Sequence, residues 1–232
     1  MKQINETKFT SDNGLITFIH GDCMEFMAGC KENEFELSCV DVPYGIQEDG
    51  SKNHTRGKLA KSKDYKAYSS GDEKAPEIEY FLELYRISKN SIIWGANHFI
   101  SKIPHDSSCW IVWDKDNGET DFADCELAWT SFKTAVRIFK WKWQGMLQGN
   151  MKNKQIRCHP NEKPIQLYRW IFKNYAKPTD HVLDTHGGSM SSAIAAHMEG
   201  LRMTIIELDK EYFDKAINRF SIYERQQTIN FE

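Results

Sequence analysis

The fold is decided by the stretch HVLDTHGGSMSSAIAAHMEGLRMTIIEL, residues 181–208. The apolar run at 181–184 predicts a buried strand, the following glycine pair predicts a tight turn, and the small residues up to Gly200 predict a helix. A second apolar run at 203–208 predicts the next strand. This succession of strand, glycine turn, helix and strand is typical of the repeating unit of an α/β protein.

The same stretch carries the residue types of a nucleotide-binding edge. Gly187 and Gly188 let the backbone turn tightly and approach a ligand, and the helix after them presents unpaired N–H groups to an anion. Glu207 follows Gly188 by 19 residues. This is close to the ~20-residue offset at which an acid reaches ribose hydroxyls in doubly wound folds. An ordinary tight turn between a strand and a helix is the alternative.

Outward from this stretch, strand-like and helix-like patterns alternate along the chain. Short apolar runs predict further strands at 15–19, 35–40, 91–94, 110–113 and 125–132. Amphipathic spacing predicts helices around 26–30, from 76 to 85, over 165–175 and from 212 to 223. The pattern predicts a single α/β domain over residues 1–232, in which helices cover a sheet.

Composition excludes several protein classes. No apolar run approaches the ~18 residues of a membrane span, and the chain does not start with the apolar region of a secretory signal. The six cysteines form no Cys-x-x-Cys pair, which argues against a zinc ribbon or a disulfide scaffold and favours reduced thiols in a cytoplasmic protein. The eight histidines show no metal-ligand spacing, so we expect no metal.

Three further motifs stand near the ends of predicted strands or before the glycine turn. Asp41-Val42-Pro43-Tyr44 follows the strand at 35–40 and places a carboxylate, a rigid backbone and a ring where α/β sheets bind ligands. Alone, the tetrapeptide also fits a turn with a capping Asp and a packed Tyr. Gly21-Asp22 ends the preceding strand, and His159-Pro160-Asn161-Glu162-Lys163-Pro164 comes before the last third of the chain.

Together these motifs resemble the DNA amino-methyltransferases that use S-adenosylmethionine, in the permuted class whose catalytic motif precedes its glycine motif. That family has Asp-Pro-Pro-Tyr or Ser-Pro-Pro-Tyr as its catalytic tetrapeptide, His-Pro-x-x-Lys-Pro before the glycine motif, and Asp-Pro-Phe-x-Gly-Ser-Gly as that motif. Residues 205–213 look like its ribose-binding strand and the helix that follows. The likeness covers residues 15–224 and implies a doubly wound, mostly parallel, seven-stranded Rossmann-like sheet.

The resemblance implies methyl transfer to the exocyclic N6 of an adenine that is flipped out of DNA. Asp41 and the carbonyl of Val42 would accept hydrogen bonds from the amino group beside Pro43, and Tyr44 would stack on the base. Asp rather than Ser at position 41 favours adenine over cytosine. The implied cofactor-binding residues are Asp22, Cys23, Asp41, Lys163, Pro164, Asp184, His186, Gly188, Ser189, Ser191 and Glu207.

Within that set, Glu207 would bind the ribose hydroxyls and Asp22 the adenine amine of the cofactor. Lys163 would pair with the cofactor carboxylate, unless it lies on a charged surface loop. The chain departs from the family at Val42, which replaces a proline, and in the glycine motif at His186 and Met190. A positive φ at Met190, or a Met190 side chain that faces the cofactor, would weaken cofactor binding. The alternative is a tolerated variant, because the neighbouring serines at 189, 191 and 192 keep the turn small.

The charge of the chain is segregated, although its overall net charge is only −3. Residues 133–158 carry +7 and residues 51–68 carry +5, which leaves −15 on the remainder. We expect a target-recognition insertion at 133–158, with Trp141 and Trp143 interleaved among cations, and a basic mobile loop at 46–74. A solvated face over buried tryptophans is the alternative for the first segment. The candidate DNA-binding residues are Lys52, Arg56, Lys58, Lys61, Lys63, Lys133, Arg137, Lys140, Lys142, Lys152, Lys154 and Arg157.

Other functions on the same scaffold stay open at this point. A cytosine-N4 or RNA methyltransferase shares the scaffold, and a non-catalytic DNA-binding relative would explain the departures at Val42 and Met190. The short chain favours a homodimer to cover a full DNA site. The target sequence cannot be derived from these motifs, because it depends on which side chains reach the groove.

Overall fold

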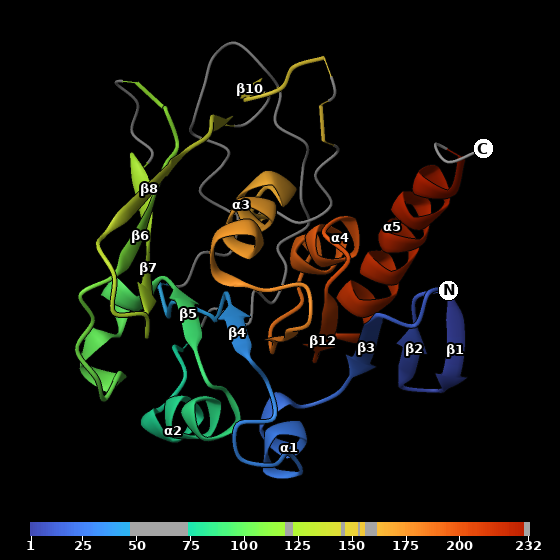
Figure 1. Ribbon diagram of the computed structural model, residues 1–232, viewed down its shortest axis with the longest axis horizontal. Coiled ribbons are helices and arrows are strands. Elements are labelled where there is room, and N and C mark those ends of the chain that lie inside the picture. The colour runs from blue at the N-terminus through green and yellow to red at the C-terminus, as the bar shows by residue number, and fades with distance from the viewer. Residues whose placement is uncertain (47–73, 119–122, 145–146, 153, 156–161, 230–232) are drawn as a thin grey trace.

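The computed structural model describes residues 1–46, 74–118, 123–144, 147–152, 154–155 and 162–229 (Figure 1). Within these ranges one mixed sheet of ten strands runs in the order β1-β2-β3-β12-β11-β4-β5-β7-β6-β8. Its strands are β1 (Lys2–Asn5), β2 (Lys8–Thr10), β3 (Ile16–His20), β4 (Leu37–Val40), β5 (Ser91–Trp94), β6 (Trp110–Asp114), β7 (Cys125–Thr130), β8 (Arg137–Lys140), β11 (His181–Asp184) and β12 (Arg202–Glu207). A separate hairpin pairs β9 (Trp143–Gln144) with β10 (Leu147–Gln148).

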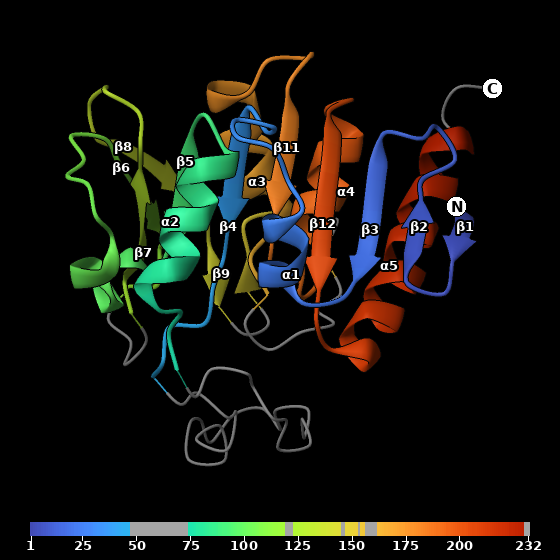
Figure 2. The same ribbon diagram turned by 90° about the horizontal axis from the view of Figure 1, so that it is seen from below.

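Helices cover both faces of the sheet (Figure 2). One layer holds α1 (Cys23–Ala28) and α2 (Ile78–Ile87), and the other holds α3 (Ile165–Tyr175), α4 (Ser191–Met198) and α5 (Lys210–Ile229). Two 3-10 turns, η2 (Ala96–His98) and η3 (Ile100–Lys102), follow β5. None of the helices in the described ranges is both long and apolar enough to cross a membrane.

The central strands are apolar on both sides because each of them packs against two helical layers. Side chains alternate between the faces of a strand, so Ile92 and Ile205 join the core under α3–α5, while their neighbours Ile93 and Ile206 join the core under α1 and α2. All four side chains are fully buried. Continuous apolar runs of this kind are typical of parallel strands covered on both faces.

Strand direction determines where the polar motifs meet. Strands β3, β12, β11, β4 and β5 are parallel neighbours. Their carboxyl ends therefore lie at one edge of the sheet, and Asp22, Asp41, Asp184 and Glu207 end or follow four of these strands. Because β7 is antiparallel to both β5 and β6, β6 and β8 also run in the direction of β4.

The predicted α/β class is confirmed, but the predicted number of seven strands is too small for this sheet. The hairpin of β1 and β2 extends one edge, and β8 extends the other. All four side chains of β1 are exposed, and β8 has one half-buried and three exposed residues. β1 carries no apolar run, and so the sequence signal that reveals buried strands is missing from it. β8 lies within residues 136–143, where apolar and polar residues alternate as in a strand, but the basic segment as a whole gave no clear assignment.

The two basic segments have different outcomes. Residues 47–73, nearly all of the predicted loop at 46–74, lie outside the described residues. In the predicted insertion at 133–158, β8 joins the main sheet and β9–β10 form their own hairpin. Part of this segment is therefore continuous with the sheet.

Candidate active site

The tetrapeptide predicted to be catalytic, residues 41–44, lies where β4 ends. Val42 is 2% exposed and packs with the core under α1 and α2, which fixes the backbone beside Asp41. The hydroxyl of Tyr44 turns back and donates to Oδ1 of Asp41 at 2.9 Å. The motif therefore forms a closed local arrangement in which the ring of Tyr44 lies beside the Asp41 carboxylate.

A buried lysine from another part of the chain completes this arrangement. The ammonium of Lys163 lies 2.5 Å from Oδ1 of Asp41 and 3.1 Å from Oε2 of Glu126. It also donates to the Tyr44 hydroxyl at 2.9 Å. The Lys163 side chain is only 5% exposed, and Pro164 begins α3 directly after it. Lys163 thus pairs with Asp41, the carboxylate predicted to be catalytic, and the cofactor carboxylate would have to share it.

The charges of this cluster depend on one another. Burial raises the pKa of Asp41, and the Lys163 ammonium opposes that rise while Glu126 adds to it. Burial alone would lower the pKa of Lys163, but Asp41 and Glu126 outweigh it and raise that pKa. For Glu126, burial is outweighed by Lys163 and Lys115, which lower its pKa to about 2. The ammonium of Lys163 and the carboxylate of Glu126 are therefore both charged at neutral pH.

The sequence analysis missed Glu126 because it lies inside a strand and belongs to no motif. Its carboxylate reaches Lys115 through Oε1 at 2.5 Å and Lys163 through Oε2. The available signal was an acid followed directly by the apolar residues Leu127, Ala128 and Trp129. A charged side chain next to a buried run needs a partner.

Gly95 makes room for Tyr44. It follows β5 with φ +71°, and a Cβ at this position would overlap the Tyr44 ring. His98 of η2 also contacts the Tyr44 ring, because its imidazole stacks on it at a centroid distance of 5.1 Å and an interplanar angle of 16°. Only glycine combines this left-handed conformation with so close an approach.

The glycine turn begins at a buried carboxylate. Asp184 is 1% exposed, accepts from Ser192 Oγ at 2.6 Å through Oδ2, and accepts from the N–H of His186 at 3.1 Å through Oδ1. Burial raises the pKa of Asp184 to about 7, although both hydrogen bonds oppose the shift. Burial also lowers the pKa of His186 to about 4, so this imidazole is neutral where the resembled family has Phe.

Glu207 holds the other side of the turn. Its Oε2 accepts from the N–H of Gly188 at 2.7 Å and its Oε1 accepts from the N–H of Asp209 at 2.8 Å. Gly188 has φ +48°, and a Cβ built on it would meet no atom within 4 Å. The turn is therefore open on the side of Gly188, next to a half-buried carboxylate at the strand end predicted to bind ribose.

Met190 occupies a strained position. It precedes α4 with φ 54° and ψ 31°, in the left-handed region, and its side chain is fully buried in the core under α3–α5. A left-handed residue with a side chain costs about 1–2 kcal/mol. Burying a Met side chain offsets that cost with roughly 1.5–3 kcal/mol. Met190 therefore has the positive φ that was predicted to weaken cofactor binding, while its side chain packs into the core.

Asp22 and Cys23, both predicted to bind the cofactor, also form the start of helix α1. Asp22 caps α1, because its Oδ1 accepts from the N–H groups of Met24 and Glu25 at 2.7 and 3.0 Å. Cys23 starts that helix, and burial together with the charge of Asp22 raises the pKa of its thiol to about 11. Because β3 and β12 are paired with His20 opposite Glu207, these residues lie beside the ribose-binding candidate.

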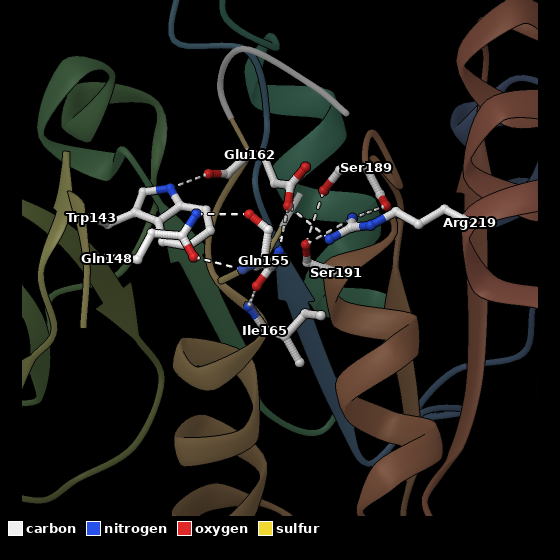
Figure 3. A network of polar contacts seen from close by, with 8 residues as sticks. All are labelled: Trp143, Gln148, Gln155, Glu162, Ile165, Ser189, Ser191 and Arg219. Carbon is white, nitrogen blue, oxygen red and sulfur yellow. Dashed lines mark hydrogen bonds and ion pairs between the residues drawn. The ribbon is translucent and has the colours of Figure 1, made fainter. Parts of the chain in front are cut away.

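A buried network joins the turn to the basic segment (Figure 3). Arg219 of α5 donates to the carbonyl of Ser189 at 2.6 Å, to Ser191 Oγ at 3.2 Å and to Glu162 Oε1 at 2.7 Å. The Arg219 and Glu162 side chains are 9% and 0% exposed. Gln155 donates to the same Glu162 oxygen.

From Gln155 the network continues into the hairpin. Gln148 and Gln155 exchange two hydrogen bonds of 2.7 and 2.8 Å, and Trp143 Nε1 donates to the carbonyl of Glu162 at 2.8 Å. The predicted recognition segment and the predicted cofactor turn are therefore attached to the same buried ion pair. Of the two tryptophans that the alternative for this segment expected to be buried, Trp143 is buried and Trp141 is partly buried.

Comparisons with known proteins identify the family. The family model described as DNA methylase, of N6 and N4 methyltransferases, matches residues 44–218. This is well over half of the chain. The chain belongs to the N6/N4 DNA methylases. The match confirms the family predicted from the motifs, that of S-adenosylmethionine-dependent DNA amino-methyltransferases.

Relatives and solved structures agree with this family. The Type II methyltransferase M.HinfI of Haemophilus influenzae is 25% identical over 88% of this chain and 68% of its own length. M2.MboI of Moraxella bovis is 21% identical over 91% of this methylase and 90% of its own length.

Among solved structures, the M1.HpyAVI–SAM complex has a TM-score of 0.55 at 22% identity and covers 88% of this chain and 99% of its own. The cytosine-N4-specific PvuII DNA methyltransferase has a TM-score of 0.59 at 12% identity, with coverages of 97% and 96%. At these identities the two structures support the Rossmann-like fold.

The edge of the sheet fits S-adenosylmethionine by the chemistry of its residues. Glu207 and Asp22 offer carboxylate oxygens to hydroxyl and amine donors, and Gly188 leaves the backbone of the turn open. Within the described ranges, no group of three or more His, Cys, Asp and Glu side chains could hold a metal ion.

The predicted DNA-binding cations of the methylase separate into two places. Lys140 ends β8 and Lys142 follows it, at the same edge of the sheet as Asp41. Asp116 pairs with both of them, at 3.1 and 3.5 Å. Arg137 begins β8 at the opposite edge.

The remaining candidates fall into two further groups. Lys133, Lys152 and Lys154 lie in exposed connections. The other six candidates lie outside the described residues: Lys52, Arg56, Lys58, Lys61, Lys63 and Arg157.

We expect Glu162→Gln to lower the free energy of unfolding of the methylase by about 3 kcal/mol, because it leaves the buried Arg219 guanidinium without its carboxylate. Urea denaturation measures the change. The matched control is Glu211→Gln, which removes a carboxylate that is 79% exposed and pairs with Lys215. Equal effects of the two substitutions would show that the buried pair adds nothing to stability.

We expect Gly95→Ala to destabilise the protein by about 1–3 kcal/mol more than Gly14→Ala, because the new methyl group displaces the Tyr44 ring. Both glycines have a positive φ, +71° and +73°, but a Cβ at Gly14 meets no atom within 4 Å. The control therefore carries the same backbone strain without the overlap. Equal losses in urea denaturation would contradict the role of Gly95 in placing Tyr44.

The pKa of Asp184, about 7 in the folded state, lies above the ~3.9 of an unfolded aspartate. The folded state therefore binds this proton more tightly, and the stability it contributes is present below about pH 4 and lost as pH rises through 7. We expect Asp184→Asn to be more stable relative to the unsubstituted protein at pH 8 than at pH 5, by about 2–3 kcal/mol. The exposed Asp214→Asn serves as control, and a pH-independent difference for Asp184→Asn would refute the assignment.

Proposed function

We propose that this methylase transfers a methyl group from S-adenosylmethionine to the exocyclic N6 of an adenine flipped out of duplex DNA. The observation that carries the proposal is that the contacts of the Asp41 carboxylate are made to only one of its two oxygens. Lys163 and Tyr44 both bind its Oδ1, whereas no described residue donates to Oδ2. One carboxylate oxygen is held in place, and the other is left to accept from an amino group.

Two acceptors are needed for the amino group. Oδ2 of Asp41 accepts one of its N–H groups and the main-chain carbonyl of Val42 accepts the other. These two hydrogen bonds draw the nitrogen toward tetrahedral geometry and free its lone pair. Because these acceptors are already positioned, little reorganisation accompanies the reaction. The ionised state of Asp41 is required, and Lys163 favours it.

Tyr44 is the residue proposed to stack on the flipped base. His98 covers one face of its ring, so a base that stacks on this face displaces the imidazole. The hydroxyl of Tyr44 stays bound to Asp41, which couples the stacking surface to the acceptor oxygen. Pro43, between Val42 and Tyr44, restricts the backbone of the motif.

The proposed cofactor site is the edge formed by the turn and its neighbours. Glu207 binds the ribose hydroxyls with the lone pairs that its backbone contacts leave, and Asp22 binds the adenine amine. When bound there, S-adenosylmethionine supplies the methyl group on its sulfonium. The remaining residues proposed to line this site are Cys23, Asp41, Lys163, Pro164, Asp184, His186, Gly188, Ser189 and Ser191. M1.HpyAVI, which has a similar fold, was solved as a complex with SAM, and this supports S-adenosylmethionine as the cofactor.

DNA contacts are proposed for the cations at the catalytic edge. Lys140 and Lys142 end or follow β8 at that edge, and DNA phosphates would replace Asp116 as their partner. Arg137, at the opposite edge, is a weaker candidate for the same DNA segment. The proposals for a basic loop at 46–74, a single domain and a homodimer rest on the sequence alone.

Two other functions are carried by specific observations. The PvuII enzyme with a similar fold is cytosine-N4-specific, so N4 of cytosine is the second candidate acceptor. Met190 in the left-handed conformation motivates the non-catalytic relative. Micromolar binding of S-adenosylmethionine in calorimetry would remove that second alternative.

The test of the function is mass spectrometry of duplex DNA after incubation with the protein and S-adenosylmethionine. We expect N6-methyladenine, and finding only N4-methylcytosine would overturn the choice of base. Comparing turnover on duplex DNA, single strands and RNA tests the substrate, because equal rates would contradict the preference for duplex DNA.

We expect Asp41→Ala to abolish transfer while the affinity for S-adenosylmethionine stays within about tenfold, because Asp41 binds the target amino group. Radiolabelled methyl incorporation and calorimetry measure the two quantities. Asp214→Ala, at a side chain that is 52% exposed, is the control and should leave both unchanged. A large loss of cofactor affinity in Asp41→Ala would show that its main role is cofactor binding.

A further inference from the structure

Glu126 brings a second carboxylate to the catalytic cluster from a different part of the fold. It lies on β7, opposite Trp113 of β6, and its side chain is 22% exposed. Oε2 is 3.1 Å from the Lys163 ammonium and 3.4 Å from the Tyr44 hydroxyl. Both groups that bind Oδ1 of Asp41 are therefore also in contact with Glu126.

All three N–H donors of the Lys163 ammonium have acceptors. An ammonium has three N–H donors, and Lys163 has three partners: Asp41, Glu126 and the Tyr44 hydroxyl. Its side chain is almost completely buried, so water cannot readily replace a lost partner. Removing one partner forces the freed donor to turn to another acceptor or remain unsatisfied.

We propose that Glu126 is a positioning residue for methyl transfer: it engages one donor of Lys163 and so keeps the second oxygen of Asp41 available to the target amino group. The inference rests on the proposed function of Asp41. Glu126 touches neither the base nor the cofactor in this role and acts only through Lys163 and Tyr44.

The nearest anionic acceptor for a freed donor is Asp41 itself. Without Glu126, Lys163 can bind both oxygens of that carboxylate, and a charge-assisted pair of this kind is about twice as strong as a neutral hydrogen bond. The target amino group would then have to displace an ammonium. The chain holds Glu126 in place from the other side, since Lys115 binds its Oε1.

The charges around Asp41 predict how its ionisation responds. Lys163 lowers the pKa of Asp41, and Glu126 raises it as a like charge. Other titratable groups that interact with Asp41 are Asp184, Tyr168 and Cys39, from β11, α3 and β4. They are the same in every variant below, so differences between the variants report on Lys163 and Glu126.

The experiment compares Glu126→Gln with the unsubstituted protein, using labelled S-adenosylmethionine and bacterial genomic DNA free of methylated bases. For Glu126→Gln we expect kcat to fall at least tenfold while the calorimetric affinity for S-adenosylmethionine stays within threefold. The acid limb of the kcat profile between pH 4 and 8 should move to lower pH, because Asp41 loses a like charge. Lys163→Met should move that limb to higher pH, because Asp41 loses its cation.

Two further variants separate charge from shape and from surface effects. Glu126→Asp keeps the carboxylate, so its acid limb should stay near that of the unsubstituted protein and its kcat should exceed that of Glu126→Gln. Glu211→Gln removes an exposed paired carboxylate and should leave kcat and its pH profile unchanged.

The inference is overturned if Glu126→Gln keeps both the kcat and the acid limb of the unsubstituted protein. It is also overturned if Glu126→Asp behaves like Glu126→Gln, because the carboxylate would then have no specific role. Should Glu126→Gln fail to fold, the acid limb of the kcat profile of Glu126→Asp decides. The inference is overturned if that limb moves to lower pH, because Glu126→Asp retains the like charge beside Asp41. No incorporation by the unsubstituted protein is a failure of the proposed function instead.

Discussion

The parallel alignment of β3, β12, β11 and β4 is the constraint on which the rest of the site depends. It brings the carboxylates of Asp22, Glu207, Asp184 and Asp41 to one edge of the sheet. Carboxylates that are partly removed from water need hydrogen-bond donors or cations. Backbone N–H groups two or three residues away bind Asp22 and Asp184, and Glu207 accepts from the N–H groups of Asp209 and of the more distant Gly188. Asp41 is paired with the ammonium of Lys163, which comes from a distant segment.

Two buried cations organise the two halves of this edge. Lys163 holds the catalytic cluster through Asp41, Glu126 and Tyr44, and Arg219 holds the turn through Ser189 and Glu162. Glu162 and Lys163 are adjacent residues, so one short segment before α3 serves both halves. A displacement of this segment would change the position of the Asp41 carboxylate and the glycine turn together.

The central elements were predictable because their signals are local. Helix α3 and strand β11 have the predicted bounds, and β5 was predicted at 91–94, since each is a short apolar or amphipathic run ended by polar residues or proline. The exposed strand β1 was not predicted, because it shows no apolar run. Residues 136–143, which include β8, alternate in a strand-like manner, but this alternation did not decide an assignment. Among site residues, Asp41, Asp184 and Glu207 stand at strand ends, where sequence pattern places them. Glu126, Arg219 and Gly95 take part only through side chains from elsewhere in the chain.

The sequence by itself determined the α/β class, the family motifs and the edge at which the polar residues gather, because strand direction follows from the order of the elements. It could not determine the partners of these residues. Whether Lys163 faces solvent or Asp41, whether Met190 is strained, and whether Lys140 is free or paired with Asp116 all depend on packing. Only the tertiary structure decided them, because a hydrogen bond or ion pair requires atoms within about 3 Å, and that proximity is set by the whole fold.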